Sequence, residues 1–299
     1  MEQTLPFLIL LVAGQIMRRI PGFPADTDKS LNLYVIYVAL PALVLVQVPK
    51  LTLSSDLLAP LLMPWVVVVV SGVLVLAICR VFGWSREITG ALLLMVPLGN
   101  TSFLGIPMVE MFFGFSGVKY AILYDQFGSF LALSTYGTFI LAVYGGGEKL
   151  SFLKIFRKVV FFPPFVALVI ALGLGSVNFP PWLESMLTMT AKSLVPVVLV
   201  AIGFAMRLRM PTSELLPFVV GISTRLLVVP VVFIFACRLL DLTGPAIQVS
   251  LFETAMPSMV TAGALASIAG LRPRLTSALV GYGILASFVT LPLIYSLLP

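Results

Sequence analysis

The sequence has no histidine, two cysteines and few charged residues, and each shortage excludes a class of protein. Charged side chains make up 10% of the 299 residues, whereas a soluble domain carries about a quarter. A chain so poor in charge cannot cover a surface that faces water, so the sequence predicts an integral membrane protein. Because Cys79 and Cys237 have no metal-binding spacing and no histidine accompanies them, the sequence predicts neither a zinc site nor a disulfide framework.

The positions of the basic residues indicate how the chain is oriented in the membrane and do not suggest nucleic-acid binding. They are scattered between apolar runs and never form one stripe, although the net charge is +6. The first apolar run precedes Arg18 and Arg19, whereas a signal peptide has its charges before the run, so we expect a first transmembrane helix. One set of alternate loops holds thirteen Lys and Arg residues and the other holds three. This asymmetry predicts that both termini face outward and that the loop at 145–158 is cytoplasmic.

Ten apolar runs have about the length of a membrane span, which is roughly 17–25 residues. We expect them at 5–17, 31–48, 57–79, 88–113, 118–144, 159–177, 187–205, 216–240, 245–269 and 275–298. The connections between them are short and rich in Gly, Pro and charge, and none is typical of a separate soluble domain. The predicted fold class is therefore an all-α integral membrane protein with ten transmembrane helices.

An internal repeat divides the chain. Cys79 and Cys237, each followed by Arg, lie 158 residues apart, and so do Tyr124 and Tyr282 with the Ser-Phe pair that follows each. This agreement favours a duplicated unit of five helices. Because five is odd, the two copies enter the membrane from opposite sides. We expect a first repeat at 1–147, a short cytoplasmic loop at 148–158, and a second, inverted repeat at 159–299.

The fourth and ninth runs each carry proline and small polar residues in mid-span. From Met95 the fourth reads Met-Val-Pro-Leu-Gly-Asn-Thr-Ser-Phe-Leu-Gly-Ile-Pro-Met, and at the repeat offset its centre falls on Pro257 and Ser258. An unbroken helix would leave polar groups and proline-freed carbonyls in hydrocarbon. Discontinuous helices in matching places of inverted repeats indicate a transport site at the membrane midplane. We predict two broken helices that cross there, with a proline kink in an ordinary packing helix as the alternative.

Five ionisable residues fall inside the predicted spans, where such groups are costly and mark functional sites: Glu110, Asp125, Lys192, Arg225 and Glu253. Glu110 and Lys192 lie near span ends, where an interfacial position is usual. For Arg225, snorkelling and a partner inside the bundle both stay open. For Asp125, which we expect to open its helix, a polar cavity wall and a plain helix-start position near the outer interface both stay open.

The residues around the breaks suggest what could bind. Glu253 lies one turn before Pro257, where its carboxylate and unwound carbonyls could hold Na⁺ or the carboxylate could exchange a proton; a carboxylate buried for packing is the alternative. Asn100 and Thr101 lie at the first break, beside a half-helix N-terminus whose free N–H groups suit a carboxylate substrate. A capping role for Asn100 is compatible with that hypothesis.

Several motifs carry a family resemblance: Leu40-Pro41-Ala42-Leu43, Gly99-Asn100-Thr101-Ser102, Tyr124-Asp125-Gln126, Arg225-Leu226 before Pro230, and Ala255-Met256-Pro257. Together they resemble the auxin efflux carrier family over essentially the whole chain. That family is similar in fold to the bile acid sodium symporters. The resemblance implies two inverted five-helix repeats, a scaffold of the first, second, sixth and seventh helices that is often dimeric, and a transport domain that slides as an elevator.

The resemblance also implies roles for individual residues. Asn100 matches the crossing asparagine that meets a substrate carboxylate, and Pro257 matches the crossing proline of the ninth helix. Glu253 is in a place comparable to the Glu that bile acid symporters use for Na⁺. Plant auxin carriers are thought to work without such coupling, so coupling to Na⁺, to H⁺ or to neither stays open. The loop at 145–158 is too short for the regulatory sites of the larger plant carriers, which implies a compact bacterial-type member.

These inferences define three sets of candidate site residues. The substrate-binding set is Asn100, Thr101, Ser102, Asp125, Gln126, Pro257 and Ser258. The cation-coupling set is Glu253, Asn100 and Thr254. The helix-crossing set is Pro97, Gly99, Pro107 and Pro257. We expect no cofactor beyond a coupling Na⁺ or H⁺, and as partners membrane lipid, a small organic anion and a second copy bound through the scaffold helices, in a bacterial inner membrane.

Other classes of function fit less well. An intramembrane aspartyl protease needs two carboxylates that share a site, but the aspartates other than Asp125 all lie in predicted loops: Asp26, Asp28, Asp56 and Asp241. We therefore expect no enzyme. A channel fits broken helices, but the sequence has no ring of like charges and no carbonyl filter motif. The predicted function is secondary transport of a small organic anion by elevator-type alternating access, with an uncoupled uniporter or channel-like facilitator as the alternative.

Overall fold

The structure is a computed structural model that describes residues 5–50, 55–145, 160–174, 179–206 and 214–299. Every regular element in these residues is helical, which confirms the all-α class. Six helices among them are long and apolar enough to cross a membrane: Thr27–Gln47, Leu58–Val81, Val118–Tyr144, Pro181–Ala205, Leu215–Leu239 and Pro273–Ser296. Three shorter apolar helices are Pro6–Met17, Thr101–Phe113 and Pro163–Leu174. The count of ten spans stays a prediction, and the loop at 148–158 lies outside the described residues.

The first half of the chain contains a helix broken near its middle. Its α-helices are α1 (Leu5–Met17), α2 (Thr27–Tyr34), α3 (Leu40–Gln47), α4 (Leu58–Val81), α5 (Arg86–Met95), α6 (Ile106–Phe113), α7 (Val118–Leu123), α8 (Phe130–Ala132) and α9 (Thr138–Tyr144). Two short 3₁₀ turns, η3 (Val48–Lys50) and η4 (Ser55–Leu57), flank the connection between α3 and α4. The break separates α5 from α6, as the prolines and glycines of that run predict.

The second half of the chain also contains a broken helix. Its α-helices are α11 (Pro163–Leu174), α12 (Pro181–Lys192), α13 (Leu194–Ala205), α14 (Leu215–Ser223), α15 (Val229–Leu239), α16 (Pro245–Thr254), α17 (Val260–Ile268) and α18 (Pro273–Ser296). The break separates α16 from α17, where Pro257 cannot donate to a helical carbonyl.

Several long helices contain π-helical turns, which insert an extra residue and often occur at functional sites. They are η2 (Val35–Ala39), η5 (Thr101–Gly105), η6 (Tyr124–Ser129), η7 (Leu133–Gly137) and η9 (Thr224–Val228). Three of them, η5, η6 and η9, carry polar or charged residues that the sequence singles out. An extra residue rotates every following side chain around the helix axis, so these turns decide which side chains face the crossing.

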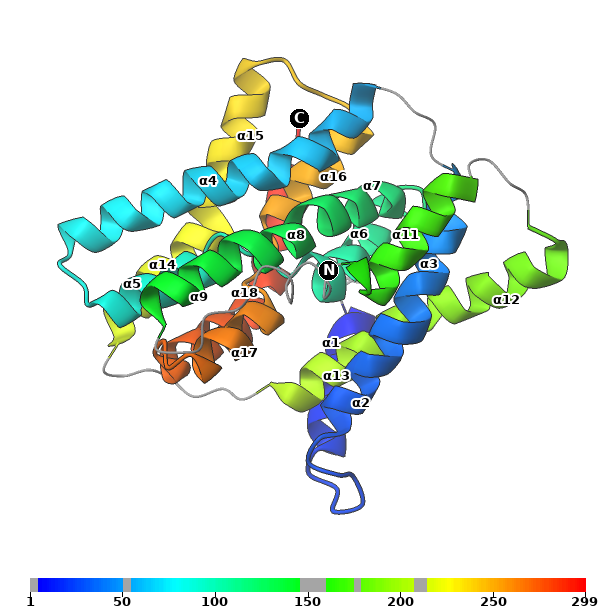
Figure 1. Ribbon diagram of the computed structural model, residues 1–299, viewed down its shortest axis with the longest axis horizontal. Helices are drawn as coiled ribbons and strands as arrows, with labels where there is room; N and C mark the ends of the chain where they lie inside the picture. Colours follow the sequence, from blue (N-terminus) through cyan, green and yellow to red (C-terminus); the bar gives the residue numbers. More distant parts are fainter. Residues whose placement is uncertain (1–4, 51–54, 146–159, 175–178, 207–213) are drawn as a thin grey trace.

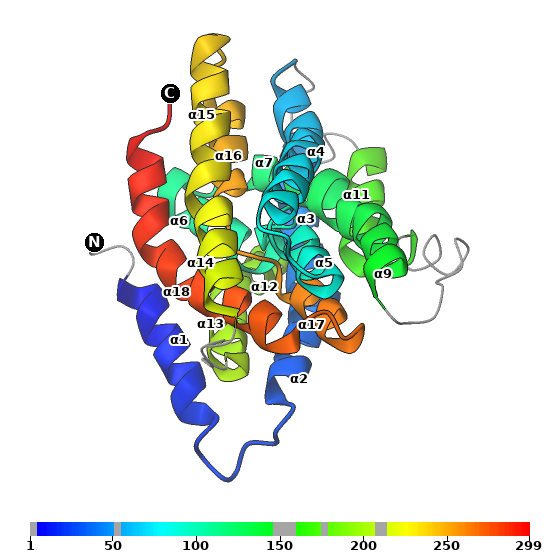
Figure 2. The same ribbon diagram turned by 90° about the vertical axis from the view of Figure 1, so that its left-hand side faces the viewer.

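The helices pack as two groups (Figures 1 and 2). In one group α1 packs along α13, α3 packs against α11 and α12, and α13 also contacts α2. Helices α1 and α13 approach closely at Gly14, where an added Cβ would lie 2.2 Å from the carbonyl oxygen of Val200. Small residues permit such a close approach between membrane helices. In the other group α4 contacts η6 and α16, α5 contacts α9, and α17 packs on α18. The broken helices belong mainly to this second group.

Helix ends that the charge pattern places on one side of the membrane lie together. Arg272, which precedes α18, forms ion pairs with Glu214 at 3.1 Å and with Glu87 at 3.4 Å. Those residues begin or precede α14 and α5, so three connections on the predicted cytoplasmic side meet at one guanidinium. On the predicted outer side, Phe112 and Phe113 of α6 pack against Phe252 and Tyr295. The two contacts bracket the breaks in the middle of the helices.

Candidate functional site

The two breaks meet in a short piece of antiparallel pairing. Gly99 and Ser258 form an antiparallel β-bridge. The N–H of Asn100 donates to the carbonyl oxygen of Pro257 at 2.8 Å, and the N–H of Met259 donates to that of Leu98 at 2.9 Å. Backbone groups freed by the breaks thus satisfy one another, which is how irregular backbone survives at membrane depth. Of the predicted crossing residues, Gly99 and Pro257 lie in the crossing itself and Pro97 lies in the break that leads to it.

Pro107 is placed differently from the other crossing candidates. It lies inside the half-helix Thr101–Phe113, at the point where the π-helical turn η5 passes into α6. It does not lie in the crossing.

Arg225 holds the crossing from a third helix. Its side chain in η9 is buried, and its Nε donates to the carbonyl oxygen of Met256 at 2.7 Å while Nη1 donates to that of Val96 at 2.9 Å. These carbonyls lie just past the C-terminal ends of α16 and α5, where helix dipoles are negative and free carbonyls need donors. Arg225 therefore does not snorkel to the membrane surface; it binds partners inside the helix bundle. Ser258 adds a second brace, because its Oγ donates to the carbonyl oxygen of Met95 at 2.6 Å.

The position of the Arg225 guanidinium leaves room for only a glycine at position 99. A Cβ at this position would lie 2.0 Å from Nη2 of Arg225, far inside van der Waals contact. Any side chain would therefore displace a guanidinium that is fixed by two hydrogen bonds.

Asp125 is the centre of a buried hydrogen-bond cluster. Its Oδ1 accepts from the hydroxyls of Thr101 at 2.6 Å and Ser102 at 2.5 Å, and its Oδ2 accepts from Nε2 of Gln126 at 2.7 Å. The sequence-based expectation that Asp125 opens a helix is wrong, because α7 begins at Val118 and Asp125 lies in the π-helical turn η6. The side chain is 1% exposed, far from a helix-start position at an interface.

Several polar atoms at the crossing have no hydrogen-bond partner within the described residues. They are Nδ2 of Asn100, Oε1 of Gln126 and both carboxylate oxygens of Glu253. Asn100 makes no side-chain cap to η5, so capping does not account for it. Buried polar groups are nearly always paired. Unpartnered ones at a break are therefore the places where a ligand would bind.

A cavity of about 340 Å³ adjoins the crossing between the two groups of helices. Asn100, Ser102 and Asp125 line it, and other hydroxyls face it from Ser134, Thr138 and Thr261. Its apolar walls are Ile36, Leu40, Phe103, Phe130, Leu133, Leu141, Phe162, Met259 and Leu265. The other predicted site residues lie behind this surface: Thr101 and Gln126 support Asp125, and Pro257, Ser258, Glu253 and Thr254 do not line the cavity.

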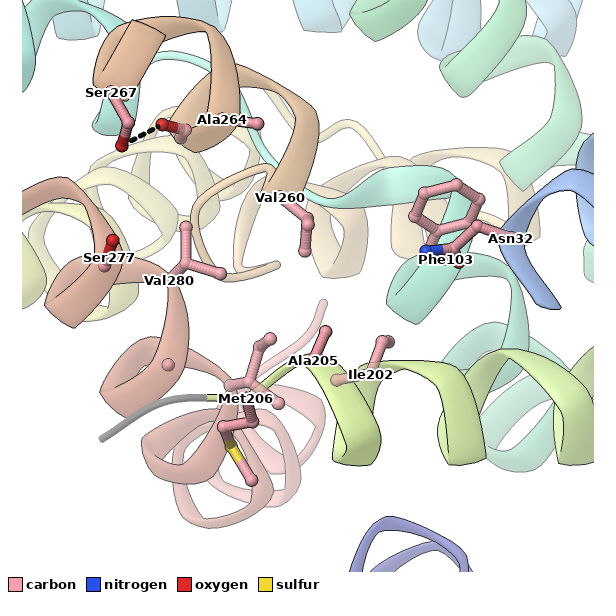
Figure 3. Close-up of a pocket in the computed structure, with 13 residues that line it drawn as sticks. Asn32, Phe103, Ile202, Ala205, Met206, Val260, Ala264, Ser267, Ser277 and Val280 are labelled. Atoms are coloured by element: carbon pink, nitrogen blue, oxygen red, sulfur yellow. Dashed lines mark hydrogen bonds between the residues drawn. The ribbon is translucent and has the colours of Figure 1, made fainter. Parts of the chain in front are cut away.

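A second cavity of about 210 Å³ lies on the other side of α17 (Figure 3). Ile202, Ala205 and Met206 from the end of α13 form one wall, and Val260 and Val280 face them (Figure 3). Phe103 lines both cavities. Both cavities are mostly apolar, but the second has no charged lining residue among those described, so it offers less to a small polar ligand than the first.

Comparison with known proteins identifies the family. The family described as membrane transport protein matches residues 1–295. The chain belongs to the membrane transport protein family. This confirms the resemblance to auxin efflux carriers. The chain is 26% identical over 295 residues to an uncharacterized transporter of Methanothermobacter thermautotrophicus, which covers 98% of this chain and 96% of the relative. It is 28% identical over 267 residues to an uncharacterized transporter of Methanocaldococcus jannaschii, covering 86% and 85%.

The geometry of the site separates the residues that build the crossing from those that face the cavity. Arg225, Gly99 and Ser258 build the crossing, whereas Asn100, Ser102 and Asp125 face the cavity. Tyr124 was not among the predicted site residues, yet it is 2% exposed and lies next to Asp125 in η6. Its repetition as Tyr282 and its place in the motif Tyr124-Asp125-Gln126 are the signals in the sequence that could have found it.

Proposed function

We propose that the protein is a secondary transporter of a small organic anion, a carboxylate, bound beside the crossing. The observation that carries the proposal is the unpartnered amide of Asn100, 2% exposed, on the wall of the cavity beside the crossing. Asn100 also lies directly before η5, and the first N–H groups of a half-helix attract anions. A carboxylate placed there would accept from the amide and from the helix terminus together.

Alternating access by an elevator motion is the mechanism that we propose for the two groups of helices. The group of α1, α3, α11, α12 and α13 would serve as the scaffold and the group with the broken helices would move. The outer face of α1 exposes Ile9, Val12 and Ile16, which a second copy or lipid would cover. We propose a homodimer through such scaffold surfaces, with both termini outside a bacterial inner membrane.

Coupling to Na⁺ or H⁺ is a further part of the proposal, with Glu253, Asn100 and Thr254 as the candidate residues. Support comes from the Glu253 carboxylate, which is fully buried while neither oxygen has a hydrogen-bond partner in the described residues. Burying an ionised carboxylate without a partner is very costly, so a proton or a cation would stabilise it. An uncoupled uniporter is the competing mechanism, and the experiment below separates the two.

Thermal unfolding of the purified protein tests the proposal. The probes are acetate, pyruvate, malonate, succinate and benzoate as sodium-free salts, each with and without Na⁺ and across pH. A ligand that binds only the folded protein raises Tm by mass action, by about 2.7 kcal/mol of stability at a hundred times Kd. Binding that needs Na⁺ or acid pH indicates symport, and binding indifferent to both indicates uniport. No shift with any carboxylate would contradict the proposal.

The Asn100→Ala variant tests the assigned position. Its side chain makes no hydrogen bond within the described residues, so folding should be unchanged. Losing a hydrogen bond to a charged ligand costs about 1.5–3 kcal/mol, so carboxylate affinity should fall about ten- to hundredfold. Isothermal titration of both proteins with the best carboxylate measures the change. Wild-type affinity in the variant would move the site away from the crossing.

A further inference from the structure

The described residues contain four buried charged side chains: Asp125, Glu214, Arg225 and Glu253. Glu214 is balanced at a helix end by Arg272, 3.1 Å away. The other three lie at the crossing, and they are two acids and one guanidinium.

All three approach one short segment of the first broken helix. Thr101 and Ser102, at the start of η5, donate to Asp125. At the end of η5, a Cβ on Gly105 would lie 2.3 Å from Oε2 of Glu253. Just before η5, the guanidinium of Arg225 covers Gly99. Glu253 interacts electrostatically with both Asp125 and Arg225.

This cluster does not balance its own charge. Arg225 stays protonated under ordinary conditions, so with both acids ionised the cluster carries one net negative charge. Within the described residues, neither acid forms an ion pair with Arg225, and no basic residue lines the cavity that Asp125 faces. An anion that enters this cavity would approach an uncompensated carboxylate in a medium that screens charge poorly.

We propose that binding of the substrate anion is accompanied by uptake of one monovalent cation, H⁺ or Na⁺, at the Asp125–Glu253 pair, and that Arg225 sets the number at one. The inference rests on the proposed function and adds its stoichiometry. Asp125 lines the cavity and gives the cation an entry, and Glu253 approaches the opposite end of η5. If Arg225 were absent, two cations would be needed to neutralise the two acids. If one acid were absent, Arg225 alone would neutralise the other and no cation would be needed.

The geometry also provides ligands for either ion. Oxygen atoms suit a hard cation such as Na⁺, and next to Asp125 lie the unpartnered Oε1 of Gln126 and the Ser102 hydroxyl. A proton needs only one of the two carboxylates. The groups that face the pair from the packed elements are Tyr124, Arg225, the hydroxyls of η5 and the Gln126 amide.

The test is a linkage measurement on the purified, full-length protein. The affinity of the tightest-binding member of the carboxylate panel is measured over a series of Na⁺ concentrations at fixed pH, and over a pH series at fixed Na⁺. The slope of log affinity against log cation activity gives the number of cations taken up. We expect a slope of about one in one of the two series, which also identifies the ion.

Two variants place the cation. Asp125→Asn and Glu253→Gln each remove one charge at constant volume, and in Asp125→Asn the new amide can donate to the unpartnered oxygen of Gln126. Asp125→Asn, at a residue that lines the cavity, should bind the carboxylate with altered affinity, and both variants should show a slope near zero. Glu214→Gln is the matched control, a buried acid that already has its own partner, and its slope should stay at one.

The outcomes separate the inference from the proposed function. A slope of zero or two in the unchanged protein, or a slope of one that persists in both crossing variants, overturns the stoichiometry and leaves the transporter proposal intact. Absence of any carboxylate binding to the unchanged protein overturns both. If one variant does not fold, the other decides.

Discussion

The two breaks at the crossing have similar sequences and different uses for their polar side chains. In the first break, Asn100 has an unpartnered amide, and Thr101 and Ser102 direct their hydroxyls to Asp125 on another helix. In the second, Ser258 donates to a backbone carbonyl of the first break, and Thr254 donates to the carbonyl of Leu251 in its own helix at 2.6 Å. Asn100 and Ser102 of the first break face the cavity and Thr101 supports Asp125 beside it, whereas Ser258 and Thr254 donate to backbone carbonyls.

This difference indicates that the two broken segments have different tasks. The first break presents chemistry to a ligand, and the second supplies the support and the carboxylate of Glu253 behind it. Four substitutions test that division, and they are ordered here by the size of the effect expected.

Gly99→Ala should have the largest effect. The added methyl group would overlap Nη2 of Arg225, and the guanidinium cannot retreat without losing its bonds to Val96 and Met256. Overpacking together with loss of charged hydrogen bonds should cost about 3 kcal/mol or more. We expect little monodisperse protein and a clearly lower Tm in detergent. Gly173→Ala is the control, because a Cβ there meets no atom within 4 Å; equal Tm values for the two variants would show that Arg225 does not fix the crossing.

The sequence predicted the breaks better than it predicted their partners. Proline, glycine and small polar residues in mid-span are a local signal, so the interruptions near Pro97 and Pro257 could be placed from the chain alone. Which helix supplies Arg225 to the crossing is a matter of three-dimensional packing, and one sequence leaves snorkelling equally open. Asp125 was misplaced because we expected its helix to begin there, whereas α7 begins at Val118 and Asp125 lies in η6, where it accepts from Thr101 and Ser102.

Thr101→Val should have the second-largest effect. Valine has nearly the same shape but leaves Oδ1 of Asp125 with one hydroxyl donor instead of two. Removing a hydrogen bond to a charged group costs about 1.5–3 kcal/mol. Denaturation should show that loss, and carboxylate binding should weaken because the cavity wall around Asp125 is disturbed. Ser134→Ala is the control in the same cavity, since its hydroxyl bonds only to the carbonyl of Phe130. A Thr101→Val protein as stable as this control would contradict the role given to the first break.

Ser258→Ala, in the second break, should reduce stability without affecting binding. Its Oγ braces the carbonyl of Met95 and does not line the cavity. Loss of one neutral hydrogen bond costs about 1 kcal/mol, so Tm should fall by a few degrees while carboxylate affinity stays within about twofold. Parallel thermal and calorimetric titrations measure both quantities. A tenfold loss of affinity at unchanged Tm would return Ser258 to the substrate-binding set and remove the contrast between the breaks.

Thr254→Val should have the smallest effect. The hydroxyl of Thr254 bonds to the carbonyl of Leu251 in the same helix, and valine keeps the β-branched shape in a fully buried position. Because the bond is local to one helix and the side chain keeps its shape, we expect a change within about 0.5 kcal/mol. The linkage slope for the coupled cation should also be unchanged, which distinguishes Thr254 from its neighbour Glu253. A slope that falls toward zero in Thr254→Val would make this hydroxyl a cation ligand, and the second break would then take part in binding as directly as the first.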